Sequence, residues 1–334
     1  MSKRIFVFWC VFFTGQGLLA QDMGFNPDGI EPQTSPFRKF MTNFSFNFQI
    51  GYGRTFYTHD IPQLAILRNN GALLLTDDVN PGVDNPISAY RYWLNDPQLI
   101  NTTFNEDDRL VSSDSTTLRM VGRGHNMPIT LSLHYTIKER FRIGGGATFE
   151  FHNISRVGPK SGDTLGTYES NFGTTLHRRF FGLAGYRFLA FRNLSYVAEV
   201  RAGSFNLGND YNSELIQKGL FFDVGVSIER HLSEYFRVTL RPSIELKNYT
   251  INFPDTEIAL QHKMVTPYVS LGASYSIPEL RRCPIKSCHI QINHVHGGKE
   301  YRSRRHPFYK KQNPNYGENY PQLFRYKGKN KRRL

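Results

Sequence analysis

Alternation of apolar and polar residues with a period of two is the feature that most restricts how this chain can fold. Phe46 and Phe48 fall on one face of the first alternating run, whereas Asn47 and Gln49 fall on the other. Successive side chains of a β-strand point to opposite faces, so this period predicts strands. The runs that show it are residues 44–53, 128–137, 141–152, 174–188, 194–205, 220–229, 236–246 and 268–277.

The connections between these runs alternate in length. Tight turns are predicted at 137–141 and around 190–193 and 232–235. Strands of about ten residues can cross a bilayer when tilted, and short turns at one end with long loops at the other are typical of transmembrane barrels. The sequence therefore predicts an all-β fold: an eight-stranded antiparallel up-and-down transmembrane β-barrel with long extracellular loops. The long polar loops are expected at 58–126, 155–173, 206–218 and 250–264.

A soluble β-sandwich or a lipocalin-like barrel would alternate too, but it would turn its apolar face inward. Here the face opposite the apolar one is polar and charged, which suits lipid outside and a polar interior. Proline removes a hydrogen-bond donor from a sheet, so Pro128, Pro242 and Pro267 are expected at strand ends or bulges. The residues expected to face lipid include Phe46, Phe48, Leu131, Leu133, Val224, Val226, Leu240 and Leu271.

Charged residues recur on the inward face of the predicted strands. A barrel of eight strands is only wide enough for its own side chains, and unpaired buried charge is costly. We therefore expect an interior ion-pair network in place of a pore. Its members are Arg142, Glu150, Glu199, Arg201, Asp223, Glu229, Arg241 and Glu245.

The first twenty residues have the layout of a secretory signal peptide, with Lys3 and Arg4 before an apolar core and Ala20 at the cleavage site. Cleavage would remove Cys10. A mean hydropathy of −0.45 argues against a bundle of transmembrane helices. The domain boundaries that follow are 1–20 for the signal peptide, 21–40 for a periplasmic N-terminal segment, 41–278 for the barrel and 279–334 for a basic periplasmic tail.

The tail carries the net charge of the chain. Residues 281–334 contain 15 Lys or Arg and 2 Asp or Glu, a surplus of 13 that equals the formal net charge of +13. Export excludes nucleic acid as the main partner, so an irregular basic segment interleaved with aromatics is expected to dock onto a periplasmic or outer-membrane protein, or onto peptidoglycan. The expected docking residues are Arg304, Arg305, Tyr309, Tyr316, Tyr320, Arg325 and Tyr326.

Two cysteines, Cys283 and Cys288, open this tail, with His289, His294 and His296 close behind. An oxidising compartment favours a disulfide between the cysteines. These residue types also bind metals, but the spacing is not a usual zinc arrangement, so no metal or cofactor is predicted.

Catalysis is not expected either. Ser132 and His134 share a face, and Glu150 and His152 lie on the next run, but polar-lined barrels place such residues inward without catalysis.

The first long loop holds acidic residues whose oxygens suit calcium, but they lack the spacing of an EF-hand, so we expect a solvated loop without bound metal. Within it, residues 87–94 are expected to form a short helix or a contact patch. The acidic residues are Asp77, Asp78, Asp84, Glu106, Asp107 and Asp108.

Taken together, the signal peptide, the eight aromatic-rich strands and the alternating loop lengths resemble the small outer-membrane barrels of the OmpA/OmpX type. The abundance of Tyr, Phe and Asn is most similar to their Bacteroidota versions. The resemblance covers about residues 41–278 and implies an integral outer-membrane location with both termini in the periplasm. The expected function is a non-enzymatic anchor or accessory subunit whose tail docks onto secretion or outer-membrane biogenesis machinery or the cell wall. The alternatives are a ligand-binding or transport barrel acting through its outer loops and a lipid-modifying enzyme.

Overall fold

The computed structural model places most of the predicted barrel and part of the tail. The signal segment and the seven expected docking residues (Arg304, Arg305, Tyr309, Tyr316, Tyr320, Arg325 and Tyr326) lie outside the described residues. Described are residues 31–32, 36–61, 64–69, 71–78, 80–111, 118–160, 166–168, 170–191, 194–232, 235–254, 259–288, 290 and 294–302.

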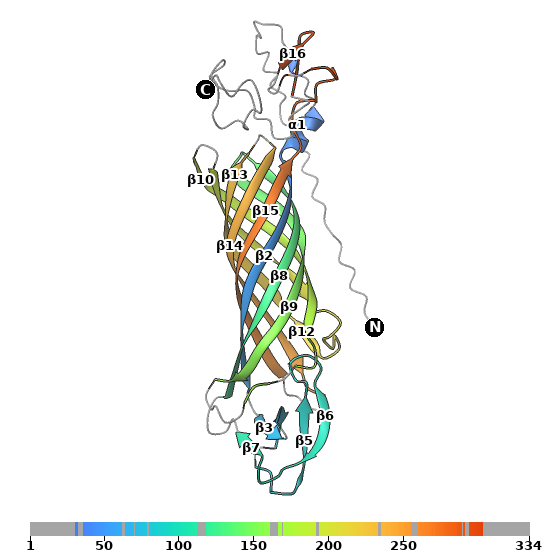
Figure 1. The fold of residues 1–334 in the computed structure, drawn as a ribbon, viewed down its shortest axis with the longest axis vertical. Coiled ribbons are helices and arrows are strands. Elements are labelled where there is room, and N and C mark those ends of the chain that lie inside the picture. Colours follow the sequence, from blue (N-terminus) through green and yellow to red (C-terminus); the bar gives the residue numbers. More distant parts are fainter. Residues whose placement is uncertain are drawn as a thin grey trace, which may run out of the picture.

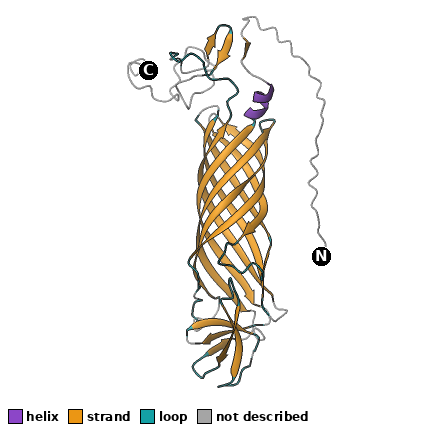
Figure 2. Cartoon of the chain, turned by 90° about the vertical axis from the view of Figure 1, so that its right-hand side faces the viewer, coloured by secondary structure: helices purple, strands orange, loops and turns teal. Residues whose placement is uncertain are grey.

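Long antiparallel strands pair in a ring, each with the next along the chain, and the pairing of the last with the first closes the barrel (Figures 1 and 2). The short strand β12 (Ile216–Lys218) adds to one of them, β14. An all-β, antiparallel, up-and-down sheet is thus confirmed. The ring consists of β2 (Phe44–Ile61), β8 (Leu118–Ile137), β9 (Phe141–Pro159), β10 (Thr174–Phe191), β11 (Leu194–Asn206), β13 (Leu220–His231), β14 (Phe236–Asn252) and β15 (Ala259–Ser276).

Several of these strands extend beyond their predicted bounds. β2 and β8 remain paired as far as Ile61 and Leu118, inside the expected loop 58–126. Likewise β14 and β15 pair through Asn252 and Ala259, within the expected loop 250–264. The predicted strands end too soon because the inward residues become aromatic at this end, as Tyr57 and Tyr249 illustrate. Polarity therefore no longer distinguishes the inner face of the strand from the outer one.

The three prolines lie inside strands and not at their ends. Each coincides with a lapse in pairing to one neighbour. Around Pro128 the β2–β8 pairing stops after Ile50↔Ile129 and resumes in the same register at Gly53↔Asn126. Similar gaps occur between β13 and β14 at Pro242 and between β15 and β2 at Pro267. The missing amide donor is therefore tolerated where the ladder is already interrupted.

The first long loop is a folded module and not the solvated polar loop that was expected. Its five strands form a separate sheet in the order β6-β5-β4-β3-β7, at one end of the barrel (Figures 1 and 2). We call residues 64–111 the cap. The expected helix or patch at 87–94 is largely the strand β5. The cap strands are β3 (Ala65–Asn69), β4 (Ala72–Thr76), β5 (Pro86–Arg91), β6 (Gln98–Thr103) and β7 (Arg109–Val111).

The opposite end of the barrel carries the short helix α1 (Pro36–Thr42) and a small sheet (Figure 1). In that sheet β17 (Lys299–Tyr301) pairs with both β16 (His294–His296) and β1 (Glu31–Pro32). The first part of the tail is therefore ordered, although an irregular segment was expected. No helix in the described part of the chain has the length and hydropathy needed to cross a membrane.

Candidate functional site

The barrel reverses the usual distribution of polar and apolar side chains. On β2, Asn47 is 7% exposed while its neighbour Phe48 is 45% exposed. Soluble proteins seldom display large apolar patches, whereas a lipid-facing surface requires them. The exposed apolar belt continues around the ring. It includes Phe46, Leu131, Leu133, Ile143, Phe180, Val200, Phe222, Val224, Leu240, Ile244, Val269 and Leu271.

An arginine introduced into this belt should destabilise the protein. We expect Leu131→Arg, at a position 52% exposed, to lower the free energy of unfolding in bilayers by about 2–4 kcal/mol if the position is near the midplane. Urea titration in lipid vesicles measures this loss. As the matched control, Arg at the surface position Leu99 of the cap should cost much less. Free reaction of a Leu131→Cys variant with a water-soluble maleimide in vesicles would contradict lipid contact.

Inside the barrel, seven charged side chains form what we call the terminal-side cluster, because it lies toward the end that carries α1. Arg142 binds Glu229 through both terminal nitrogens, with the Nη2–Oε2 pair at 2.6 Å. The same guanidinium lies 3.6 Å from Glu199. Glu229 also contacts Arg237 at 3.4 Å. Paired in this way, buried charges recover part of their desolvation cost.

The rest of the terminal-side cluster is centred on Arg241. Its Nε donates to Glu199 at 3.1 Å, and its terminal nitrogens donate to Asp223. Arg201 donates to Glu199 at 3.4 Å and to the amide oxygen of Gln49 at 3.0 Å. Side chains from β2, β9, β11, β13 and β14 thus meet across the interior, so the cluster spans the lumen.

A second group, the cap-side cluster, is organised by Glu150, which is 0% exposed. Its carboxylate lies 3.2 Å from Arg179 and accepts hydrogen bonds from Lys247 at 3.0 and 3.1 Å. It also accepts one from the hydroxyl of Tyr268 at 2.8 Å. Glu245 completes the cluster by pairing with Arg179 and, at 2.9 Å, with Lys247. Two carboxylates therefore face two cations.

The structure places all eight residues of the expected network inside the barrel. Three cations were missed. Lys247 lies just beyond the predicted end of its strand, Arg237 stands at the start of the same strand, and Arg179 lies on the run with the least regular alternation. The inward positions 241, 243 and 245 of this strand are followed by position 247, so continuing the same alternation predicts that Lys247 also points inward. The eight expected residues are Arg142, Glu150, Glu199, Arg201, Asp223, Glu229, Arg241 and Glu245.

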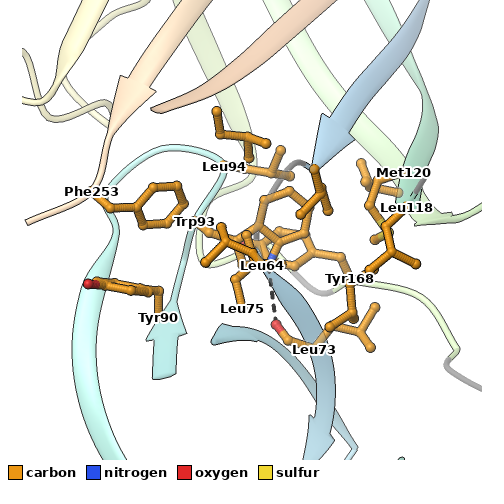
Figure 3. Packing of buried hydrophobic residues seen from close by; sticks show 14 residues of the cluster. Leu64, Leu73, Leu75, Tyr90, Trp93, Leu94, Leu118, Met120, Tyr168 and Phe253 are labelled. Atoms are coloured by element: carbon orange, nitrogen blue, oxygen red, sulfur yellow. Dashed lines mark hydrogen bonds between the residues drawn. The ribbon is translucent and has the colours of Figure 1, made fainter. Parts of the chain in front are cut away.

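The cap and other loops pack together at the cap end of the barrel. Trp93, fully buried, donates from its indole nitrogen to the carbonyl oxygen of Leu73 and stacks edge-on against Tyr168 at 4.7 Å between ring centroids. The same core contains residues from the barrel strands, among them Leu118 and Met120 of β8 (Figure 3). This shared core fixes the cap on the barrel mouth.

The loop that joins β11 to β13 binds the cap directly. Asn95 donates from its side chain to the carbonyl oxygen of Asp210 at 2.7 Å and accepts a hydrogen bond from the amide of Asn212 at 3.0 Å. Tyr249, on the inner face of β14, donates to the carbonyl oxygen of Leu94 at 3.2 Å. The cap, this loop and the barrel wall are therefore joined by hydrogen bonds as well as by apolar packing.

The space between the two charge clusters is small. A cavity of about 20 Å³ lies between the two charge clusters, lined by residues that include Arg179, Arg201, Asp223 and Glu245. A single water molecule needs roughly 10–15 Å³ of such volume, so this space suits one water and no organic solute.

Potential acid–base residues also meet in the interior. Glu150, His152 and His177 bring their ligand atoms within 4.8 Å of one another, and Thr175 lies 3.0 Å from the Nε2 of His177. All four are at most 1% exposed. Ser132 and His134 face inward too. A hydroxyl near a histidine is a requirement of nucleophilic catalysis, but a substrate must also reach it, and these groups are buried inside the barrel.

The acidic residues of the first loop do not converge. Asp108 accepts hydrogen bonds from the side chain of Asn69 and the amide of Asn105, both at 2.9 Å, and Asp78 accepts one from the amide of Asn80. These carboxylates stabilise turns in the cap. Within the described part of the chain they belong to no group of metal-ligand type.

At the terminal end, positive charge gathers around Arg38 of α1, whose Nε donates to the carbonyl oxygen of Pro278 at 2.9 Å. Partial burial, together with the nearby charges of Arg302 and Arg281, lowers the pKa of Arg38. The backbone amide of Arg302 donates to Arg281 at 2.9 Å. The base of the tail is therefore held against the barrel end as a basic surface.

The expected disulfide between Cys283 and Cys288 is not formed in the structure. Both side chains are buried, at 0% and 8% exposure, and the Sγ of Cys288 lies 3.2 Å from the Nε2 of His294. The fold brings β16, which carries His294 and His296, against the two cysteines, a proximity that the spacing of the residues along the sequence did not indicate.

No protein family matches this chain, and no curated protein matches it. Among solved structures it is similar to the outer membrane protease OmpT from Escherichia coli, at 9% identity and a TM-score of 0.29 over 70% of this chain and 96% of OmpT. It is also similar to the outer membrane protein OprG from Pseudomonas aeruginosa, at 13% identity and a TM-score of 0.29 over 69% and 94% of the two chains. A third similar structure is the outer membrane protein AlkL, at 12% identity and a TM-score of 0.30 over 69% of this chain and 89% of AlkL.

Proposed function

We propose that this protein is an integral outer-membrane β-barrel of eight strands that is closed to diffusion and anchors a basic periplasmic extension. The observation that carries the proposal is the combination of an exposed apolar belt with a lumen filled by paired charges. The cap faces the exterior and both termini face the periplasm. In this role the barrel is a rigid support and not a conduit.

The docking role is supported by the charge distribution. The tail holds the whole positive surplus of the chain, and its base, at Arg281 and Arg302, is fixed at the barrel end. A basic arm fixed at a membrane face attracts acidic partners, and aromatic residues with Arg are favoured at interface hot spots. The proposed partner is an envelope protein assembly of the secretion or outer-membrane biogenesis type, with peptidoglycan as the second possibility. Capture of that partner by tagged full-length protein, and its loss with the tail, tests the proposal.

Conductance measurements separate an anchor from a transporter. We expect purified protein in planar bilayers to give no stable channel steps, because the two charge clusters cross a narrow lumen. The sharper variant replaces residues 62–117 by a short glycine-containing turn that joins Ile61 to Leu118, which already pair. This capless barrel should also stay closed, since the ion pairs remain. Large single-channel steps from either protein would favour the transport alternative.

The enzyme alternative has a direct test as well. The buried Thr175–His177 pair is one arrangement in which an aliphatic hydroxyl contacts a histidine, at 3.0 Å. We expect no acyl-chain or peptide hydrolysis by the purified protein. Turnover that His177→Gln abolishes would overturn the non-enzymatic proposal.

A further inference from the structure

Four side chains of metal-ligand type converge at the base of the tail. The thiols of Cys283 and Cys288 and one ring nitrogen each of His294 and His296 all lie within 4.8 Å of one another. We propose that these four residues form a structural zinc site, which we call the tail site. It lies outside the barrel and is independent of the proposed anchoring function.

The local fold explains why the four meet. His294 and His296 are two residues apart on β16, so both side chains project from the same face of the strand, and their ring centroids are 4.7 Å apart. Gly297 and Gly298 have φ values of 56° and 76°, which a two-residue hairpin turn requires and glycine adopts without strain. This turn returns the chain as β17, which holds β16 in place.

Backbone hydrogen bonds hold Cys283 against this hairpin and fold Cys288 back toward it. The amide of Cys283 donates to the carbonyl oxygen of Arg302, just after β17, at 3.1 Å. The amide of Cys288 donates to Ile285 at 3.2 Å, so the segment between the cysteines is a turn that folds the second thiol back. The backbone thus fixes Cys283 beside the hairpin, and the turn places the Sγ of Cys288 3.2 Å from the Nε2 of His294.

The spacing fits a tetrahedral metal ion. Zinc bonds of about 2.3 Å to sulfur and about 2.0–2.1 Å to nitrogen place neighbouring ligand atoms roughly 3.3–3.8 Å apart. The Cys288–His294 separation of 3.2 Å is already close to this range. All four ligand atoms lie within 4.8 Å of one another, so small side-chain rotations suffice to bring them to these distances.

An unsatisfied nitrogen also points to a missing ligand. The Nε2 of His296 is buried without a hydrogen-bond partner among the described atoms. Burying such a nitrogen unpaired is costly, and coordination to a metal would remove that cost. Two thiolates with two imidazoles is a donor set that suits zinc better than calcium or magnesium, which prefer oxygen.

A zinc ion here would join three separate segments: the cysteine turn, the β16–β17 hairpin and, through β17, the N-terminal strand β1. Such small sheets lack the apolar area for independent stability, and metal coordination commonly replaces it. The ion would therefore fix where the basic tail leaves the barrel.

Metal analysis of the full mature chain, purified from membranes without chelator, tests the tail site. We expect about one zinc per chain, lost in a Cys283→Ser, Cys288→Ser double variant and in His296→Ala. His125→Ala is the matched control, since that histidine lies on β8 and contacts Tyr52. Exchange with cobalt should give the charge-transfer absorption of thiolate ligands in the parent and the control only.

Folding and redox state are checked in the same samples. Heat-modifiable migration on a gel reports the barrel, which shares no strand pairing with the tail site, so all variants should pass this check. Thiol alkylation followed by mass spectrometry reports the cysteines. Metal-free protein with a Cys283–Cys288 disulfide, or zinc retained in the double cysteine variant, would overturn the proposal.

Discussion

Replacement of Glu150 by leucine is expected to lower the free energy of unfolding by about 3–5 kcal/mol. Glu150 is fully buried and is the common partner of Arg179 and Lys247. Its removal leaves both cations with Glu245 as the remaining carboxylate of the cap-side cluster. The uncompensated charge cannot reach water beneath the cap, so most of its desolvation cost is felt in the folded state.

Urea unfolding in lipid vesicles measures the loss, with tryptophan fluorescence as one probe because Trp93 is the only tryptophan outside residues 1–20. Migration on a gel follows the barrel separately. Asp60→Asn is the matched control: Asp60 pairs with Arg119, but both side chains are about two-fifths exposed, so we expect a change of about 0–1 kcal/mol.

A second variant distinguishes lost charge balance from lost packing. Glu150→Leu combined with Lys247→Met removes one charge of each sign and should recover part of the stability, because no net charge is added to the cluster. Equal destabilisation in the single and double variants would mean that charge balance is not what Glu150 provides.

The barrel strands could be predicted because lipid and a polar interior impose opposite requirements on alternate residues. Phe46 and Phe48 cannot exchange faces with Asn47 without placing a polar amide in the belt, so the period of two is unambiguous. Where this contrast weakens, prediction fails. Phe180 and Phe181 are adjacent and equally apolar, yet one is 62% exposed and the other is 7% exposed, which hid the inward position of Arg179.

The cap and the tail sheet were missed for a different reason. Leu73, Leu74 and Leu75 are consecutive and all buried, so β4 has no alternation to detect. The available signals were turns: the Asn-Gly pair at 70–71 before β4 and Gly297-Gly298 before β17. Both are typical hairpin signals, but the polar composition around the first is also typical of a loop, and the basic composition around the second is typical of an irregular tail.

Deletion of residues 303–334 is expected to abolish partner capture while leaving the barrel and the tail site intact. This segment holds ten Lys or Arg against one Glu, so it contributes nine of the thirteen surplus charges. The ring of barrel strands closes between β2 and β15, and no described strand beyond Ser276 pairs with it. The shortened protein should therefore migrate as a compact, heat-modifiable barrel.

Two matched full-length variants separate the sources of affinity. In one, the Lys and Arg residues of 303–334 become Gln; in the other, its Tyr and Phe residues become Ala with every charge retained. If docking needs both the charges and the aromatic side chains, each of these two variants should lose the partner. Binding by the parent protein should weaken as salt rises toward and beyond about 0.15 M, where exposed charges are screened within about 8 Å.

The identity of the captured species decides between the proposed partners. A protein retained after lysozyme digestion of the cell wall supports docking onto an assembly, whereas loss on digestion indicates peptidoglycan. Partners recovered equally by the parent protein and the deletion would contradict docking through the tail. The cap would then be the next surface to test, and a protein with residues 62–117 replaced should lose what the tail deletion retained.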